Sequence, residues 1–162
     1  MEKFYGRPQG KGIKLHLGCG DYWGDGYLNL DWGVYGGTDM LLDLRKPLPF
    51  QNSVVEEIQT HDFVEHFTPE EIGLMLDDWH RVLIEGGRIF VTVPDIGTIM
   101  KEYVEKPTEA LQAFYGLGSE HRWGYTKDSI QKLFENHKFS VSVKDSDIQK
   151  DQFPRLEVEG HK

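Results

Sequence analysis

The sequence predicts an α/β fold with a mostly parallel sheet of about six to seven strands and helices between them. The chain has 162 residues, the usual size of one domain, and 38% of them are hydrophobic. Short segments that alternate apolar and polar residues recur along the chain, and amphipathic segments of helical period separate the later ones. We therefore expect a single domain over residues 1–162, in which residues 1–13 form an N-terminal arm.

Four strands are expected in the first part of the chain. Residues 13–17 and 27–31 alternate apolar and polar side chains, which is typical of half-buried strands. Residues 40–43 form the third expected strand. Residues 54–60, which include two adjacent glutamates, form the fourth.

The clearest helix is predicted over residues 69–85. Thr68 is a suitable N-cap, Pro69 occupies the first helical position, and Glu71 completes a capping box. Gly86 is expected to end the helix. One apolar stripe results from the side chains of Ile72, Met75, Leu76, Trp79 and Leu83.

The second part of the chain continues the alternation of strands and helices. Residues 88–93 form the most apolar strand, between a glycine pair and Pro94. A helix is expected from Thr126 onward, with Ile130, Leu133, Phe134 and His137 on one face. Shorter helices are expected at 98–105 and 108–115, a strand at 139–143, and a final edge strand at 156–159.

The first two connections of the predicted sheet are too short for helices. Only about ten and about eight residues separate the first three strands, whereas a parallel crossover needs roughly a dozen or more. Because parallel sheets are normally buried on both faces, one face must be thinly covered in this region. We expect the arm over 1–13, or a second copy of the chain, to cover it.

Composition excludes several classes of protein. The 18 basic and 27 acidic side chains give a formal net charge of −9, which disfavours a nucleic acid as partner. The single cysteine, Cys19, excludes an internal disulfide and a zinc site built on two or more cysteines. The longest apolar stretch is too short to cross a bilayer, and the first residues do not resemble a secretory signal. We expect a soluble, cytoplasmic domain.

A glycine loop followed by an acidic residue is the main chemical feature. Leu17-Gly18-Cys19-Gly20 follows the first strand, and Asp31 ends the second. Both lie at the carboxyl edge of a parallel sheet, where ligands bind in open α/β folds. A carboxylate there can accept hydrogen bonds from both hydroxyls of a ribose. A Gly-x-Gly pair alone predicts no more than a tight turn, and Trp23 departs from the dinucleotide-binding fingerprint.

Two histidine-containing segments are further candidates. His61, Asp62, Glu65 and His66 include side chains that metals prefer, but the two histidines are five residues apart rather than four, and we predict no metal site. Residues 119–126 contain His121, a candidate general base because an imidazole titrates near neutral pH. The alternative for this segment is a surface loop that leads into a helix.

The order of these segments resembles the class I S-adenosylmethionine (SAM)-dependent methyltransferases, and most closely their small "LGCG" branch. The glycine loop is followed by Asp31, then Asp43-Leu44, Leu48-Pro-Phe50, Glu65-His-Phe67 and the Gly86-Gly87 strand, in the order of that family. The resemblance covers residues 14–139. It implies a Rossmann-like fold, SAM as cofactor and a small-molecule methyl acceptor, in a branch that often occurs with sugar and cell-envelope biosynthesis.

The resemblance also implies roles for individual positions. Leu17, Gly18, Cys19 and Gly20 would line the methionine end of SAM. Asp31 would bind the ribose with Trp32 beside it, and Asp43 and Leu44 would lie at the adenine. His61 and Asp62 would border the reactive sulfonium, and His61 and His121 are the candidate catalytic bases. The chain departs from the family at Tyr22, where a third glycine is usual, and in the missing helix after the loop, so that Arg7 or Lys11 would have to bind the SAM carboxylate.

Three functions follow from this reading. The first is a SAM-dependent methyltransferase for a small molecule such as a sugar or cell-envelope precursor, with a site that is shallow or completed by a second subunit of a homo-oligomer. The second is a SAM-binding module without catalysis. The third is a hydrolase or lyase that cleaves SAM in the same pocket.

Overall fold

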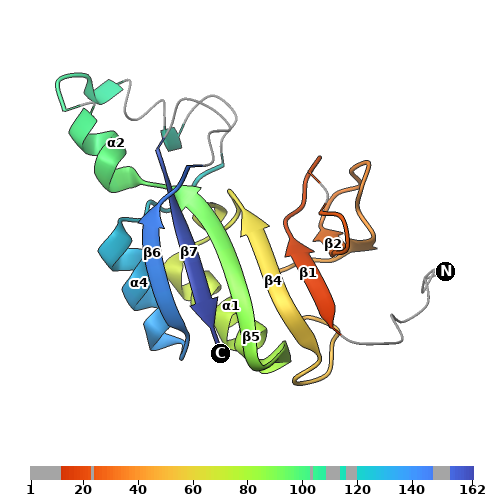
Figure 1. Ribbon diagram of the computed structural model, residues 1–162. Coiled ribbons are helices and arrows are strands. Elements are labelled where there is room, and N and C mark those ends of the chain that lie inside the picture. The colour runs from red at the N-terminus through yellow and green to blue at the C-terminus, as the bar shows by residue number, and fades with distance from the viewer. Residues whose placement is uncertain (1–11, 23, 103, 109–113, 116–119, 148–153) are drawn as a thin grey trace.

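A computed structural model of the chain shows a seven-stranded sheet in the order β3-β2-β1-β4-β5-β7-β6 (Figure 1). It describes residues 12–22, 24–102, 104–108, 114–115, 120–147 and 154–162. The first five strands in this order run parallel, whereas β7 is antiparallel to both β5 and β6. The prediction of an α/β fold with a mostly parallel sheet is confirmed.

The strands lie close to their predicted positions, with one change of order. The strand expected at 156–159 is not an edge strand, because it pairs with β5 on one side and β6 on the other. Its residues Leu156 and Val158 are fully buried, which an edge position would not require. The strands are β1 (Ile13–Leu17), β2 (Leu28–Asp31), β3 (Met40–Leu41), β4 (Val55–His61), β5 (Leu83–Pro94), β6 (Ser140–Asp145) and β7 (Arg155–His161).

Helix α1 (Pro69–Val82) begins as predicted and ends earlier. The Thr68 hydroxyl accepts from Glu71 N–H at 3.3 Å, and the Glu71 carboxylate accepts from Thr68 N–H at 2.9 Å, so the capping box is formed. The prediction that Gly86 ends the helix is wrong. Leu83 is already extended and pairs with Val55 of β4, so the tertiary pairing ends the helix and the glycines lie within β5.

The other helices follow the predicted order. The 3₁₀ helix η1 (Val64–His66) connects β4 to α1, and α2 (Ile96–Glu102) follows β5. Helix α4 (Lys127–Asn136) has Thr126 as its N-cap, in a second capping box with Ser129. The short helix predicted at 108–115 falls largely outside the described residues. Among the helices that the structure describes, none has the length and apolarity that a bilayer span requires.

One face of the sheet forms the hydrophobic core. Both α1 and α4 pack against this face, and they contact each other (Figure 1). Trp79 of α1 and Phe134 of α4 are almost completely buried there. Since side chains alternate along a strand, every second strand residue reaches this core. The strand residues in it include Leu15, Leu17, Leu30, Val55, Ile58, Ile89, Val91, Val93, Leu156 and Val158.

The opposite face of the sheet is lined by polar side chains. Glu57 of β4 forms ion pairs with Lys14 of β1 at 3.3 Å and with Arg88 of β5 at 2.7 Å, and it accepts a hydrogen bond from Tyr27. Burial, and then the neighbouring Glu57, raise the pKa of Tyr27 to about 12. These side chains alternate with the core residues along the strands, so the alternating sequence determines that the opposite face is polar.

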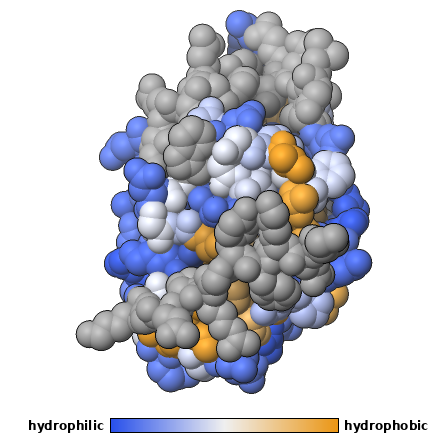
Figure 2. Space-filling view, turned by 90° about the vertical axis from the view of Figure 1, so that its right-hand side faces the viewer, coloured by the Kyte–Doolittle hydropathy of each residue, from blue (hydrophilic) through white to orange (hydrophobic). Residues whose placement is uncertain are grey.

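The first two connections contain no helix among the residues that the structure describes, as the sequence predicts. Backbone hydrogen bonds hold them instead, for example Asp39 N–H to Asn29 C=O at 2.8 Å. Viewed from this side of the molecule, hydrophobic side chains lie exposed among hydrophilic ones (Figure 2). Trp32, Val34 and Leu41 are 78%, 83% and 54% exposed. The arm expected to cover this region, with Arg7 and Lys11, lies outside the described residues apart from its last two positions.

Candidate functional site

The glycine loop and Asp31 meet at the carboxyl edge of β1 and β2. The Asp31 carboxylate, which is 5% exposed, accepts from Gly20 N–H at 2.9 Å through Oδ2 and from Trp32 N–H at 2.7 Å through Oδ1. Gly33 N–H donates to the same Oδ1 at 3.2 Å. Each carboxylate oxygen has two lone pairs, so these three hydrogen bonds fix the carboxylate and leave one acceptor position, on Oδ2, for a ligand.

The two glycines of the loop are needed for different reasons. Both have positive φ angles, +67° at Gly18 and +51° at Gly20. A Cβ on Gly18 would lie 2.2 Å from the ring of Phe63, so this position is closed by packing. A Cβ on Gly20 would meet nothing within 4 Å, so Gly20 borders open space. The side of the loop that a ligand can approach is therefore the one at Gly20 and Asp31.

Cys19 fills the loop between the glycines and lies against Thr38. Its side chain is 2% exposed, with Sγ 3.7 Å from the Thr38 hydroxyl. Burial, more than the nearby Asp31, raises the pKa of the Cys19 thiol. A thiol held protonated is a poor nucleophile, which agrees with a packing role. Leu17, just before the loop, is fully buried in the core.

The residues predicted at the adenine lie in the turn after β3. The Asp43 carboxylate binds Arg45 with two hydrogen bonds, 2.8 Å from Nε and 3.0 Å from Nη2. These hydrogen bonds lower the pKa of Asp43. Leu44 is buried and belongs to the core, and Trp32 is exposed. The adenine-side roles of Asp43 and Leu44 stay predictions.

The end of β4 contacts residues of three other strands. His61 Nδ1 lies 3.0 Å from the Thr92 hydroxyl of β5, and its ring contacts those of His16 and Phe90. Asp62 has a φ of +49°, unusual for a residue other than glycine. Its carboxylate accepts from buried Arg155 of β7 at 2.9 Å and 3.3 Å. Arg155 was not predicted from the sequence, because its partner Asp62 lies 93 residues away in the chain.

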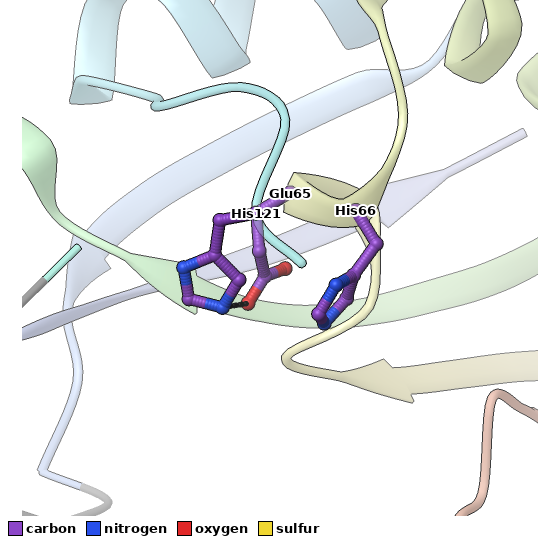
Figure 3. A group of neighbouring side chains, drawn as sticks. All are labelled: Glu65, His66 and His121. Atoms are coloured by element: carbon purple, nitrogen blue, oxygen red, sulfur yellow. Dashed lines mark ion pairs between the residues drawn. The ribbon is translucent and has the colours of Figure 1, made fainter. Parts of the chain in front are cut away.

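The His121 segment folds against η1. Glu65 C=O accepts from Arg122 N–H at 2.8 Å and from Trp123 N–H at 3.0 Å, which fixes the loop before α4. His121 Nε2 then lies 3.7 Å from Oε1 of Glu65, and the rings of His121 and His66 are 4.9 Å apart (Figure 3). Burial, followed by the nearby His66, lowers the pKa of His121.

The predicted site residues thus form two groups at the carboxyl edge of the sheet. One contains the glycine loop, Asp31 and Trp32, and the other contains the end of β4 and His121, together with Glu65 and His66, which the sequence did not predict as site residues. The predicted Asp43 and Leu44 lie outside both groups, in the turn after β3. His61 contacts His16 and Phe90, whereas His121 contacts His66 and Phe114, so the two candidate bases lie in different surroundings.

Solved structures share this fold over nearly the whole chain. A SAM-dependent methyltransferase from Methanosarcina mazei aligns with a TM-score of 0.67 and 14% identity, over 93% of this chain and 92% of that one. One from Archaeoglobus fulgidus aligns with a TM-score of 0.68 and 12% identity, over 95% and 87%. One from Mesorhizobium loti aligns with a TM-score of 0.62 and 14% identity, over 93% and 90%. The chain has the fold of the class I SAM-dependent methyltransferases.

This methyltransferase fold is visible in the structure rather than in overall sequence similarity. No protein-family model and no curated protein matches the sequence. The resemblance read from the order of the motifs is nevertheless confirmed at the level of fold. The acidic end of β2 and the glycine loop after β1 lie together at the carboxyl edge of the sheet.

Proposed function

We propose that this chain is a SAM-dependent methyltransferase that acts on a small-molecule acceptor. The observation that carries the proposal is the Asp31 carboxylate, held against Gly20 N–H at the carboxyl edge of β1 and β2. The methyltransferases among the solved structures with this fold support both the activity and the cofactor.

The loop fits an adenosine cofactor in two respects. Gly20 borders open space in which a ligand can approach the backbone, and Asp31 presents a carboxylate fixed by three N–H groups. A ribose hydroxyl would donate to the remaining acceptor position on Asp31 Oδ2, in a charge-assisted hydrogen bond. Trp32 and the Asp43-Leu44 turn are the proposed contacts of the adenosine, and His61 and Asp62 those of the sulfonium side.

The chemistry needs alignment more than a strong catalytic group. When bound, SAM supplies an electrophilic methyl group on a sulfonium sulfur. The methyl group goes to the acceptor, and the rest of the molecule leaves as a neutral thioether. The protein holds the acceptor atom close and in line. A hydroxyl acceptor must also lose a proton, and we propose His121 or His61 as the base, whereas an unprotonated amine needs none.

The acceptor class rests on the family resemblance and on charge. A sugar or cell-envelope precursor is the proposed acceptor, because the resembled branch often accompanies such pathways. The net charge of −9 argues against a polyanionic acceptor such as a nucleic acid. We also propose that a second copy of the chain completes the acceptor site, and sedimentation of a monomer at working concentrations would contradict this.

A ligand-binding experiment with two variants tests the cofactor. The purified chain is melted with SAM, S-adenosylhomocysteine, NAD or ATP. SAM at about 100 times its dissociation constant should stabilise the fold by about 2.7 kcal/mol, which raises the melting temperature by roughly 5–11 °C. Asp31→Asn keeps the shape of the side chain but removes its charge, and should lose most of this shift. Asp25→Asn, the same substitution in the connection between β1 and β2, should keep the shift.

Turnover then separates the three functions. Transfer of a labelled methyl group to a sugar or small-molecule acceptor supports the proposal. Binding of SAM without any turnover would identify a binding module, and consumption of SAM without an acceptor would identify a SAM-cleaving enzyme. Absence of a shift with all four ligands would overturn the cofactor assignment.

A further inference from the structure

Glu65, His66 and His121 form a compact side-chain group that methyl transfer by alignment does not require. One candidate ligand atom from each residue can be chosen so that all three lie within 4.8 Å of one another. Figure 3 shows the Glu65 carboxylate between the two imidazole rings. Two imidazole rings thus face one carboxylate, one from the η1 segment and one from the loop before α4.

The backbone holds these three residues in place. Glu65 and His66 lie in the 3₁₀ helix that follows β4 directly. The loop with His121 is fixed to that helix by the hydrogen bonds of Arg122 N–H and Trp123 N–H to Glu65 C=O. The Arg122 side chain also donates to Glu71 of α1 at 2.8 Å, so the loop is attached to two elements. A site of this kind needs such fixed supports.

Burial and donor type point to a cation. The Glu65 side chain is fully buried, so its carboxylate faces protein groups such as His121 Nε2, 3.7 Å from Oε1, rather than bulk water. One carboxylate and two imidazoles are a donor set that divalent transition metals prefer, whereas Mg²⁺ and Ca²⁺ prefer oxygen ligands. Metal–ligand distances of about 2.0–2.2 Å place tetrahedral ligand atoms about 3.4 Å apart, so the most separated pair must approach by up to about 1.4 Å when an ion binds.

We propose that Glu65, His66 and His121 bind one divalent transition-metal ion, of the Zn²⁺ or Mn²⁺ kind. The sequence analysis weighed a metal site at His61, Asp62, Glu65 and His66 and predicted none. The structure changes the candidate set. His61 contacts Thr92, His16 and Phe90, and Asp62 pairs with Arg155, while His121 joins Glu65 and His66.

The ion would also define how the acceptor binds, a consequence that rests on the proposed function. Three protein ligands leave coordination positions open, as in catalytic metal sites. An acceptor oxygen, such as a sugar hydroxyl, could occupy one of them and lose its proton more easily. His121 would then be a ligand, and His61 would be the remaining candidate base.

Metal titration without SAM tests the site directly. The chain is treated with EDTA, dialysed, and titrated with Zn²⁺ and Mn²⁺ by calorimetry and with Co²⁺ by visible absorption. We expect one ion per chain. His66→Ala, His121→Ala and Glu65→Gln should each weaken binding at least about tenfold, because even residues that only support a ligand have effects of that size. His137→Ala removes another histidine paired with a carboxylate, Asp77, and should leave binding unchanged.

Two results would overturn the site. One is absence of a bound ion in the wild-type chain with all three metals. The other is equal affinity in the wild type and in folded His66→Ala, with circular dichroism as the check of folding. His66 is only partly buried, so this variant decides the matter even if Glu65→Gln does not fold. Binding of SAM to the metal-free chain is measured in parallel, so that a failed cofactor assignment and a failed metal site give different results.

Discussion

The half of the sheet formed by β4–β7 and the half formed by β1–β3 are covered in different ways. Helices α1 and α4 pack on the first, where Trp79 and Phe134 are almost completely buried. The second has helix-free connections in its described residues, and Trp32 and Val34 are exposed there. We therefore expect the helix-covered half to provide most of the free energy of unfolding, whereas the loops of the other half offer backbone groups to a ligand.

The largest expected difference concerns two tryptophans. Trp79→Ala should lower the free energy of unfolding by about 3–5 kcal/mol, because it leaves a cavity between α1 and the sheet. Trp32→Ala, the same change in the loop-built half, should alter it by no more than about 0.5 kcal/mol. Denaturant unfolding of both variants measures the contrast. Similar losses in the two variants would show that the loop-built half is packed as tightly as the other.

Two glycines within one loop give the next largest difference. Gly18→Ala should destabilise the fold by about 2 kcal/mol or more, because its Cβ would meet Phe63 and its φ is positive. Gly20→Ala carries a similar backbone strain but no clash, so about 1 kcal/mol is expected.

For SAM binding we expect the reverse order of the two variants. Gly20→Ala extends into the space proposed for the cofactor, so in a calorimetric titration it should lower the affinity for SAM more than Gly18→Ala does. Unchanged SAM affinity in Gly20→Ala would place the cofactor elsewhere.

The N-cap of α1 is expected to have an intermediate effect. Thr68→Ala removes the side chain that accepts from Glu71 N–H and should lower the free energy of unfolding by about 1 kcal/mol. Ser142→Ala, at an exposed position of β6, is the control and should stay within about 0.5 kcal/mol. Thermal unfolding measures both, and a silent Thr68→Ala would mean that tertiary packing alone fixes the start of the helix.

The polar face of the sheet should show the smallest effect, and it should depend on pH. Burial raises the pKa of Glu57, but its hydrogen bonds with Tyr27, Arg88 and Lys14 outweigh this and lower it overall. The stability that it contributes is therefore present above the pKa of an unfolded glutamate, about 4.3, and is lost as pH falls through the lower folded value. Glu57→Gln should flatten the acid side of the stability profile.

The control for this change is another glutamate of the same face. Glu159→Gln, at a half-exposed position paired with Lys144, should leave the profile close to that of the wild type. The contribution of Glu57 at neutral pH should be no more than about 1 kcal/mol, since ion pairs near the surface are weak. Identical pH profiles for the wild type and Glu57→Gln would contradict a lowered pKa.

Local sequence patterns predicted most elements because they act over a few residues. The alternation in β1 and the capping box at Thr68 are set by neighbours in the chain, and both occur as predicted. Two positions were wrong for a common reason. The end of α1 and the place of β7 depend on pairing with strands far away in the sequence.

The candidate site divides in the same way. Gly20 and Asp31 were predictable because Gly20 follows the first strand, Asp31 ends the second, and parallel strands end at the same edge of the sheet. The partner of Asp62 was not predictable, because Arg155 lies 93 residues away in the chain. The group of Glu65, His66 and His121 was not predictable either, because it forms only where the loop before α4 is hydrogen-bonded to η1.

By itself, therefore, the sequence determined the fold class, the short helix-free connections and the position of the proposed cofactor loop. The reason is that strand period, helix caps and connection length are local quantities. The tertiary structure decided where the last strand inserts, where α1 ends, and which of the histidines meets a buried carboxylate. These depend on contacts between distant segments, which a periodic pattern does not encode.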